Sequence, residues 1–235
     1  MAKKQKKQKK SGSRLYRVIY AIFAGIVGCV LRIRVIGREN EPDRGGFLVC
    51  ANHISASDPV ILCYAFRKHQ VRFMAKKELF KIPLLSGLIK LLGAFPVDRG
   101  GSDVGAIKKG VKFLTDGECM GIFPQGHRYP GVDPRTTSLK NGAALISTRA
   151  SADVIPVYIA RRNNTPKLFR RTYVIIGEPI PFDSFGYNPE ESGEYARISE
   201  VIFDRVCALG ENFTDPKTAK KQAKKQAKEQ KRNAD

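Results

Sequence analysis

The sequence predicts an α/β fold in which a single mixed β-sheet is flanked by helices. The chain has 235 residues, which is long enough for one domain with a substantial hydrophobic core. From residue 45 onward, short apolar runs alternate with segments of helical periodicity. The sequence contains no internal repeat. This alternation is typical of one sheet covered by helices.

The predicted strands are short apolar runs bounded by polar or glycine-containing turns. They span residues 47–51, 71–75, 94–97, 119–123, 153–160 and 171–177. The predicted helices lie within residues 58–68, 81–93, 102–117, 138–150 and 189–210. Pro59 occupies the first turn of the first helix. The third predicted helix, residues 102–117, has Ser102 as its N-cap and ends at Gly117.

Both ends of the chain are rich in lysine. The net charge is +20, with six lysines in residues 1–10 and eight basic residues in 217–232. We predict that residues 1–13 form a disordered basic arm and that residues 213–235 form a solvated lysine-rich tail that binds anionic surfaces. The charge alone would permit a non-catalytic polybasic protein that binds membrane or nucleic acid. Because almost no aromatic residues lie among these charges, we expect no nucleic-acid partner.

An apolar segment, residues 18–31, lies between Arg17 and Arg32. Its fourteen residues are fewer than the roughly 20 that a membrane-spanning helix needs. We therefore predict a membrane-associated helix over residues 14–36 that dips into one leaflet or lies in the interface. A buried core helix and a secretory signal are the alternatives. The remaining body, residues 37–212, is predicted to form one folded domain.

The five cysteines are scattered and show no CxxC spacing. This pattern indicates buried apolar side chains in a reducing compartment. Because no group of Cys and His residues has the spacing of zinc ligands, we predict no metal site.

The stretch FLVCANHISASDPVIL, residues 47–62, carries the main chemical signal. A buried strand ends at His53, and Asp58 follows five residues later. A carboxylate that holds one imidazole nitrogen protonated leaves the other free to act as a general base near neutral pH. This works if Asp58 folds back from the following turn or helix start. The alternative is that His53 satisfies local backbone groups while Asp58 is an N-cap.

Four ordered segments decide between these interpretations. They read NHISASD (52–58), AFPVDRG (94–100), GIFPQGHRYPG (121–131) and VIPVYIA (154–160). No Gly-x-Ser-x-Gly elbow accompanies them, which argues against a serine hydrolase. With these segments the chain resembles the glycerolipid acyltransferases, most closely the 1-acylglycerol-3-phosphate acyltransferase family. The resemblance implies a glycerol-3-phosphate acyltransferase-like fold.

The resemblance also implies a reaction. An acyl thioester of acyl carrier protein or coenzyme A would donate a fatty acyl group to the sn-2 hydroxyl of 1-acylglycerol-3-phosphate, giving phosphatidic acid. His53 would be the general base and Asp58 its orienting partner, with direct attack and no acyl-enzyme. The expected acceptor is a lysophospholipid at an anionic membrane surface, on the cytoplasmic face of the cell membrane, and no cofactor is bound. Glycerol-3-phosphate or another lysolipid is the alternative acceptor.

The acceptor phosphate needs fixed cations. Arg99 and Arg128 match the second and third motifs of the family, and arginine suits multi-donor phosphate recognition. Gly126 lets the backbone approach the substrate closely. Lys76 and Lys77 are further candidates for phosphate binding, although an exposed charged turn explains them equally.

The third motif departs from the family pattern, because Gln125 replaces the usual Glu and His127 the usual Thr. We include Gln125 among the acceptor-binding candidates. If the Glu only orients a loop or an acceptor hydroxyl, Gln can replace it. If its charge is needed, activity or acceptor choice shifts. The acyl chain also needs an apolar slot near His53, for which segments 82–93 and 18–31 are candidates.

Overall fold

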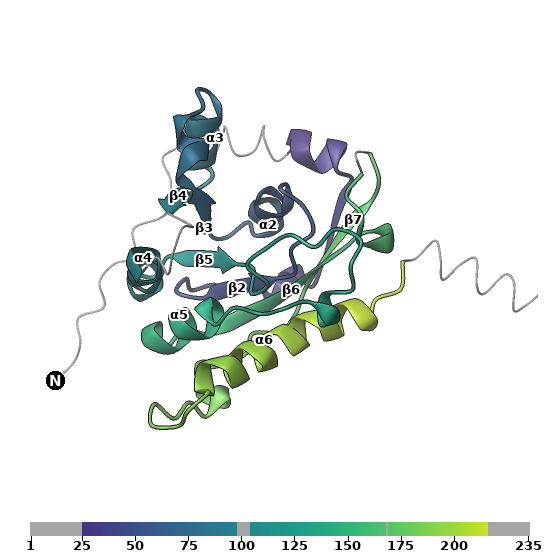
Figure 1. Ribbon diagram of the computed structural model, residues 1–235. Helices are drawn as coiled ribbons and strands as arrows, with labels where there is room; N and C mark the ends of the chain where they lie inside the picture. The colour runs from purple at the N-terminus through teal and green to yellow at the C-terminus, as the bar shows by residue number, and fades with distance from the viewer. Residues whose placement is uncertain (1–24, 98–103, 168, 216–235) are drawn as a thin grey trace, which may run out of the picture.

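The computed structural model describes residues 25–97, 104–167 and 169–215. One seven-stranded sheet runs through this part of the chain in the order β1-β7-β6-β2-β5-β3-β4 (Figure 1). Its strands are β1 (Ile33–Ile36), β2 (Leu48–Ala51), β3 (Val71–Lys76), β4 (Ala94–Val97), β5 (Cys119–Ile122), β6 (Val154–Ala160) and β7 (Thr172–Ile176). All pairings are parallel except that of β6 with β7, so the predicted single mixed sheet is confirmed.

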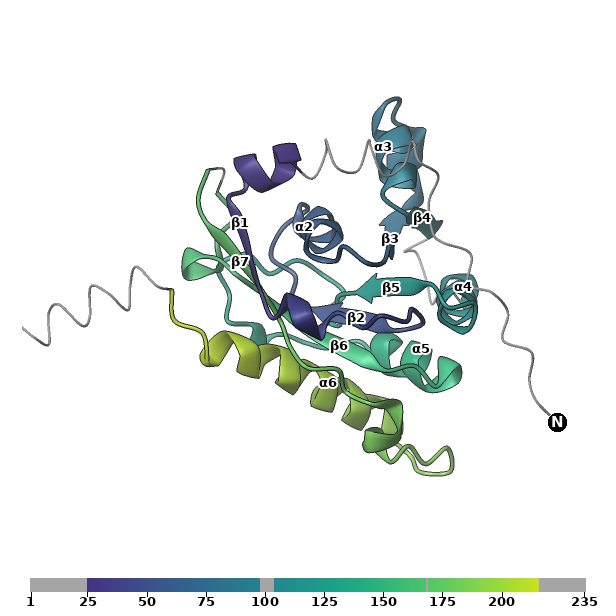
Figure 2. The ribbon, with the colours of Figure 1, turned by 180° about the vertical axis from the view of Figure 1, so that it is seen from behind.

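Helices cover both faces of the sheet. They are α2 (Asp58–Ala65), α3 (Leu85–Leu91), α4 (Val104–Thr115), α5 (Gly142–Ala150) and α6 (Glu194–Glu211). Short 3-10 helices span Arg38–Asn40, Lys77–Lys81, Pro134–Thr136, Arg162–Asn164 and Phe182–Phe185. One apolar cluster packs α2 against the sheet, and a second packs α4, α5 and α6 against the other face (Figures 1 and 2). Burial on both faces explains why the parallel strands read as continuous apolar runs.

The predicted helix over residues 14–36 is wrong at its end. Residues 25–30 are helical, but Ile33–Ile36 form the edge strand β1, which pairs parallel with β7. Ile33 is buried in the core while its neighbour Arg34 is exposed, and this alternation of exposure is that of a strand. Residues 14–24 lie outside the described part of the chain. No helix within the described residues is long and apolar enough to cross a membrane.

The sheet order brings three strand ends together. β2 lies between β5 and β6 and is parallel to both. The residues that follow these three strands therefore emerge at the same edge of the sheet, where open α/β sheets bind their ligands. His53 follows β2 at this edge.

The loop between α2 and β3 is held by the buried carboxylate of Glu41. It accepts hydrogen bonds from the backbone N–H groups of Arg67, Lys68 and His69 at 2.9, 2.8 and 3.1 Å. His69 Nδ1 lies 3.5 Å from Glu41 Oε1. Burial alone would raise the pKa of Glu41, but these interactions outweigh burial and bring the pKa below its ordinary value.

Replacing Glu41 with alanine is expected to lower the free energy of unfolding by about 2–3 kcal/mol at pH 7, because three backbone donors lose their acceptor. Since the folded-state pKa of Glu41 is lowered, its contribution is full above the ordinary value of 4.5 and is lost as the pH falls through the folded-state pKa. Urea unfolding at pH 7 and pH 3 measures both effects. Asp43→Ala, which removes an exposed partner of Lys68, is the control. An equal loss for both variants would contradict this account.

Candidate active site

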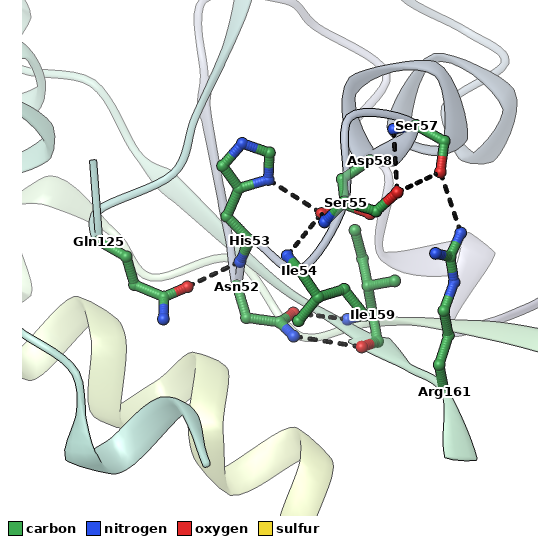
Figure 3. Close-up of polar contacts among 9 residues, drawn as sticks. All are labelled: Asn52, His53, Ile54, Ser55, Ser57, Asp58, Gln125, Ile159 and Arg161. Atoms are coloured by element: carbon green, nitrogen blue, oxygen red, sulfur yellow. Dashed lines mark hydrogen bonds and ion pairs between the residues drawn. The ribbon is translucent and has the colours of Figure 1, made fainter. Parts of the chain in front are cut away.

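The backbone of His53 is fixed from two sides, as Figure 3 shows in part. Asn52 extends the β2–β6 pairing by one residue, since its side-chain amide accepts from Ile159 N–H at 2.7 Å and donates to Ile159 O at 3.1 Å. His53 N–H donates to Gln125 Oε1 at 2.7 Å, and His53 O accepts from Tyr129 N–H at 2.9 Å. The residue after the central strand is therefore held rigidly.

The imidazole ring of His53 is fixed as well. Its Nδ1 lies 2.9 Å from Asp58 Oδ2, so the structure brings the predicted pair together. The ring stacks on Phe123, with centroids 4.0 Å apart and an interplanar angle of 14°. Because an Nδ1–H donating to the carboxylate leaves Nε2 unprotonated, Nε2 is the basic nitrogen. In Figure 3 this second ring nitrogen points away from Asp58.

Asp58 is fully buried at the first position of α2. Its Oδ2 also accepts from the backbone N–H groups of Ile54 and Ser55, both at 2.7 Å. Ser57 occupies the N-cap position and makes no side-chain capping bond. Asp58 thus satisfies local backbone donors and orients His53 at the same time, which combines the two interpretations that the sequence left open.

His53 faces a cavity of about 600 Å³. Apolar side chains from β3, β5, α4 and α5 line most of it, among them Phe73, Ile107, Ile122 and Leu145. The expected apolar slot therefore exists, but no residue of segments 82–93 or 25–31 lines it. Besides His53, the polar residues His127, Lys140, Asn141 and Arg149 also line the cavity.

Gln125 is buried, and its side-chain amide makes hydrogen bonds inside the protein. It is 1% exposed, and besides accepting from His53 N–H it donates from Nε2 to Thr137 Oγ1 at 2.8 Å. The Thr137 hydroxyl in turn donates to Pro134 O at 2.6 Å, so it needs a donor from Gln125. A side-chain amide supplies both N–H donors and an acceptor oxygen, whereas an ionised carboxylate supplies acceptors alone. This geometry matches the loop-orienting role considered for this position.

Of the other acceptor-binding candidates, one lines the cavity, and the rest lie at the surface or outside the described residues. Gly126 lines the cavity and has a φ of +70°, a backbone conformation that favours glycine. Arg128, Lys76 and Lys77 are exposed. Arg99 lies outside the described residues. Phosphate binding by these residues stays a prediction.

Sequence reasoning missed several residues that build the site. Phe123 and Tyr129 lie inside the third motif, but nothing in the sequence showed that one stacks on His53 and the other bonds its carbonyl. Arg161 directly follows the fourth motif and donates to Ser57 Oγ. Only the neighbouring positions of β2 and β6 in the sheet bring these two residues together.

The described residues contain no group of three or more His, Cys, Asp or Glu side chains that could hold a metal ion.

Comparison with known proteins identifies the family. Residues 32–160 match the acyltransferase family. The chain is 32% identical to the 1-acyl-sn-glycerol-3-phosphate acyltransferase of Bacillus subtilis (strain 168), over 78% of this chain and 90% of that protein. The corresponding protein of Borreliella burgdorferi is 32% identical over 57% of this chain and 53% of its own length.

A solved structure agrees with these matches. The crystal structure of the 1-acyl-sn-glycerophosphate (LPA) acyltransferase PlsC from Thermotoga maritima superimposes with a TM-score of 0.63 at 27% identity, covering 86% of this chain and 82% of that one. The chain therefore belongs to the acyltransferase family of enzymes.

Proposed function

We propose that the protein transfers a fatty acyl group from a thioester to the sn-2 hydroxyl of 1-acylglycerol-3-phosphate, giving phosphatidic acid for phospholipid synthesis. One observation carries the proposal. His53, with Nδ1 held by the buried Asp58, faces an apolar cavity of about 600 Å³. The names of the relatives from Bacillus subtilis and Borreliella burgdorferi support the choice of acceptor.

The reaction follows from this geometry. Nε2 of His53 takes the proton of the acceptor hydroxyl as its oxygen attacks the thioester carbonyl. The C–O bond forms, the C–S bond breaks, and the imidazolium returns its proton to the leaving thiolate. Asp58 holds Nδ1 and stabilises the transient imidazolium, while Phe123 fixes the plane of the ring.

The cysteines of the described core are poor nucleophiles, which favours direct attack. Burial raises the pKa of Cys63 and of Cys119 to about 12. The thiolate, the reactive form of the side chain, is therefore scarce at neutral pH. A cysteine-linked acyl-enzyme has no support from these residues.

The cavity suits the acyl chain, and its polar margin suits phosphate. A chain of methylene groups gains about 0.8 kcal/mol for each CH₂ that leaves water. Lys140 and Arg149 line the same cavity and supply positive charge for the phosphate groups of acceptor and donor. The donor is an acyl thioester of acyl carrier protein or of coenzyme A.

The proposal is tested by a panel of acceptors given to the purified, detergent-solubilised protein. Lysophosphatidic acid, glycerol-3-phosphate and lysophosphatidylglycerol are each supplied with acyl-carrier-protein and coenzyme A thioesters in parallel. We expect phosphatidic acid as the main product, and the faster thioester identifies the donor. Product from another acceptor alone would overturn the assignment of the acceptor.

We also infer that the protein works on the cytoplasmic face of the cell membrane, where lysolipid and soluble thioesters meet. Three exposed apolar side chains, Ile82, Leu84 and Leu88, form what we call the α3 rim, and Leu84 is 94% exposed. Lys81 and Lys90 flank the rim and are exposed too. Apolar side chains between cations are suited to an anionic lipid surface.

The helix at residues 25–30 lies along the same edge of the molecule as α3 in both views (Figures 1 and 2). Ile26 on this helix is 60% exposed, and Phe169, whose N–H donates to Val30 O, is 66% exposed. The exposed apolar side chains of three separate segments thus support one membrane-facing edge.

Replacing Leu84 and Leu88 together with aspartate is expected to lower partitioning onto vesicles by at least about tenfold, because the nearly fully exposed Leu84 alone loses roughly 1.5–3 kcal/mol of apolar burial in lipid. Vesicles of phosphatidylglycerol and phosphatidylethanolamine measure this in a flotation assay. Val201→Asp, at a half-exposed valine on α6, is the control. Equal flotation of the rim variant and the control would contradict the inference. Loss of turnover by the rim variant with acceptor dispersed in detergent would contradict it too.

A further inference from the structure

Arg161 directly follows β6, the strand next to β2. Its partly buried guanidinium donates from Nη2 to Ser57 Oγ and from Nε to Thr172 Oγ1, both at 3.1 Å. Both acceptors are neutral, and no carboxylate in the described part of the chain forms an ion pair with Arg161. The guanidinium of Arg161 therefore contacts the turn that precedes α2 and has no direct anionic partner among the described residues (Figure 3).

The nearby anion is Asp58, and its hydrogen bonding is uneven. Oδ2 accepts from His53 Nδ1 and from two backbone N–H groups. Oδ1 is buried and has no hydrogen-bond partner among the described residues. A buried carboxylate is costly unless charge or hydrogen bonds compensate it. A fixed cation close by supplies that compensation.

Arg161 and Asp58 act on each other electrostatically. Burial lowers the pKa of Arg161, and the carboxylate of Asp58 raises it in part. The groups that face Asp58 are His53 from the end of β2, Arg161 from the end of β6, and the backbone N–H groups of its own turn. Of these, Arg161 is the permanent charge.

Arg161 also holds the turn itself. Ser57 Oγ, which accepts from the guanidinium, lies 2.9 Å from Ser55 Oγ. The Ser55 hydroxyl accepts from Ser57 N–H at 3.2 Å, and Ser55 N–H donates to Asp58 Oδ2. A continuous set of hydrogen bonds therefore connects Arg161 to the carboxylate that orients His53.

We propose that Arg161 is a positioning residue of the catalytic pair, whose positive charge stabilises the buried carboxylate of Asp58 and whose hydrogen bonds hold the turn of residues 55–58. The inference rests on the proposed function, in which Nε2 of His53 must be free to take a proton. Without the cation, the His53–Asp58 pair binds a proton more tightly. The unprotonated base then becomes available only at higher pH.

The test compares pH profiles of kcat/KM for the full-length parent, Arg161→Gln and Arg161→Lys. In Arg161→Gln the acid limb of the pH profile is expected to move up by about 1 pH unit, because the pair loses the coulombic interaction of Asp58 with an opposite charge. At pH values below the acid limb of the parent, the glutamine variant is expected to lose about tenfold in kcat/KM from this shift. Arg161→Lys restores the limb. Thr172→Val removes a hydrogen-bond partner but keeps the charge, so its limb stays in place.

Two results would overturn the proposal. If the acid limb of the pH profile is the same in Arg161→Gln and in the parent, Arg161 has only a structural role. A raised KM for lysolipid with unchanged kcat and unchanged limb would make Arg161 a phosphate ligand instead. Thermal unfolding of each variant separates these results from misfolding.

A second readout keeps the inference separate from the assignment of the substrate. In ¹⁵N NMR of the full-length protein, the titration midpoint of the His53 imidazole is expected to rise in Arg161→Gln and to return in Arg161→Lys. This measurement needs no turnover. If none of the acceptors gives the expected product but the midpoint shifts, the proposed acceptor is rejected and the role of Arg161 is retained. If the midpoint does not shift, the role of Arg161 is rejected.

Discussion

Replacing His53 with alanine is expected to lower kcat by about 10²- to 10⁴-fold, which is the usual contribution of a general base. The ring nitrogen that faces the cavity disappears, and no other described imidazole is held by a carboxylate beside that cavity. KM for the acceptor is expected to change little, because the cavity and its cations remain. Steady-state kinetics with lysophosphatidic acid measures both constants.

His69→Ala is a matched control for this prediction. His69 also lies beside a buried carboxylate, Glu41, but it packs edge-on against Phe47 and does not line the cavity. This variant is expected to lose stability and to keep kcat, whereas His53→Ala keeps its thermal unfolding temperature within a few degrees. Turnover that survives in His53→Ala would reject the mechanism.

Replacing Asp58 with asparagine is expected to lower kcat by a comparable factor, about 10²–10⁴-fold, because the imidazole loses the acceptor that fixes its tautomer. The amide oxygen can still accept from the backbone of Ile54 or Ser55, so the turn is retained in part. Asp58→Ala is expected to cost a further 1–3 kcal/mol or so of stability, since buried backbone donors lose their acceptor.

Kinetics combined with urea unfolding separates these two effects. Residues that act as a unit show strongly non-additive losses. The double variant His53→Ala with Asp58→Asn is therefore expected to be no slower than His53→Ala alone. Activity of Asp58→Asn within about threefold of the parent would show that the 2.9 Å contact between the two side chains has no role in catalysis.

Much of the sheet could be predicted from the sequence, because its parallel strands are buried on both faces. The run FLVCA appears as β2, whose four residues are all buried. β1 was missed for a physical reason. It is only four residues long and begins two residues after the apolar segment 18–31 ends, so the sequence pattern assigns it to the predicted helix.

The site was predictable where the chemistry is local and not where it depends on sheet order. His53 and Asp58 are five residues apart, and one tight turn brings them together. Gln125 and Arg161 reach the same turn from β5 and β6, through contacts that span 72 and 104 residues. No local pattern in a single sequence encodes such distances, and the walls of the cavity depend on the same long-range packing.

The central claim is that His53 activates a lysophosphatidic acid hydroxyl for direct attack on an acyl thioester. The most direct measurement follows a radiolabelled acyl group in a single turnover, with and without acceptor, in the parent and in His53→Ala. We predict that label passes to phosphatidic acid in the parent alone and only when acceptor is present. Label bound covalently to the protein before acceptor is added, or transfer by His53→Ala at the rate of the parent, would contradict the account.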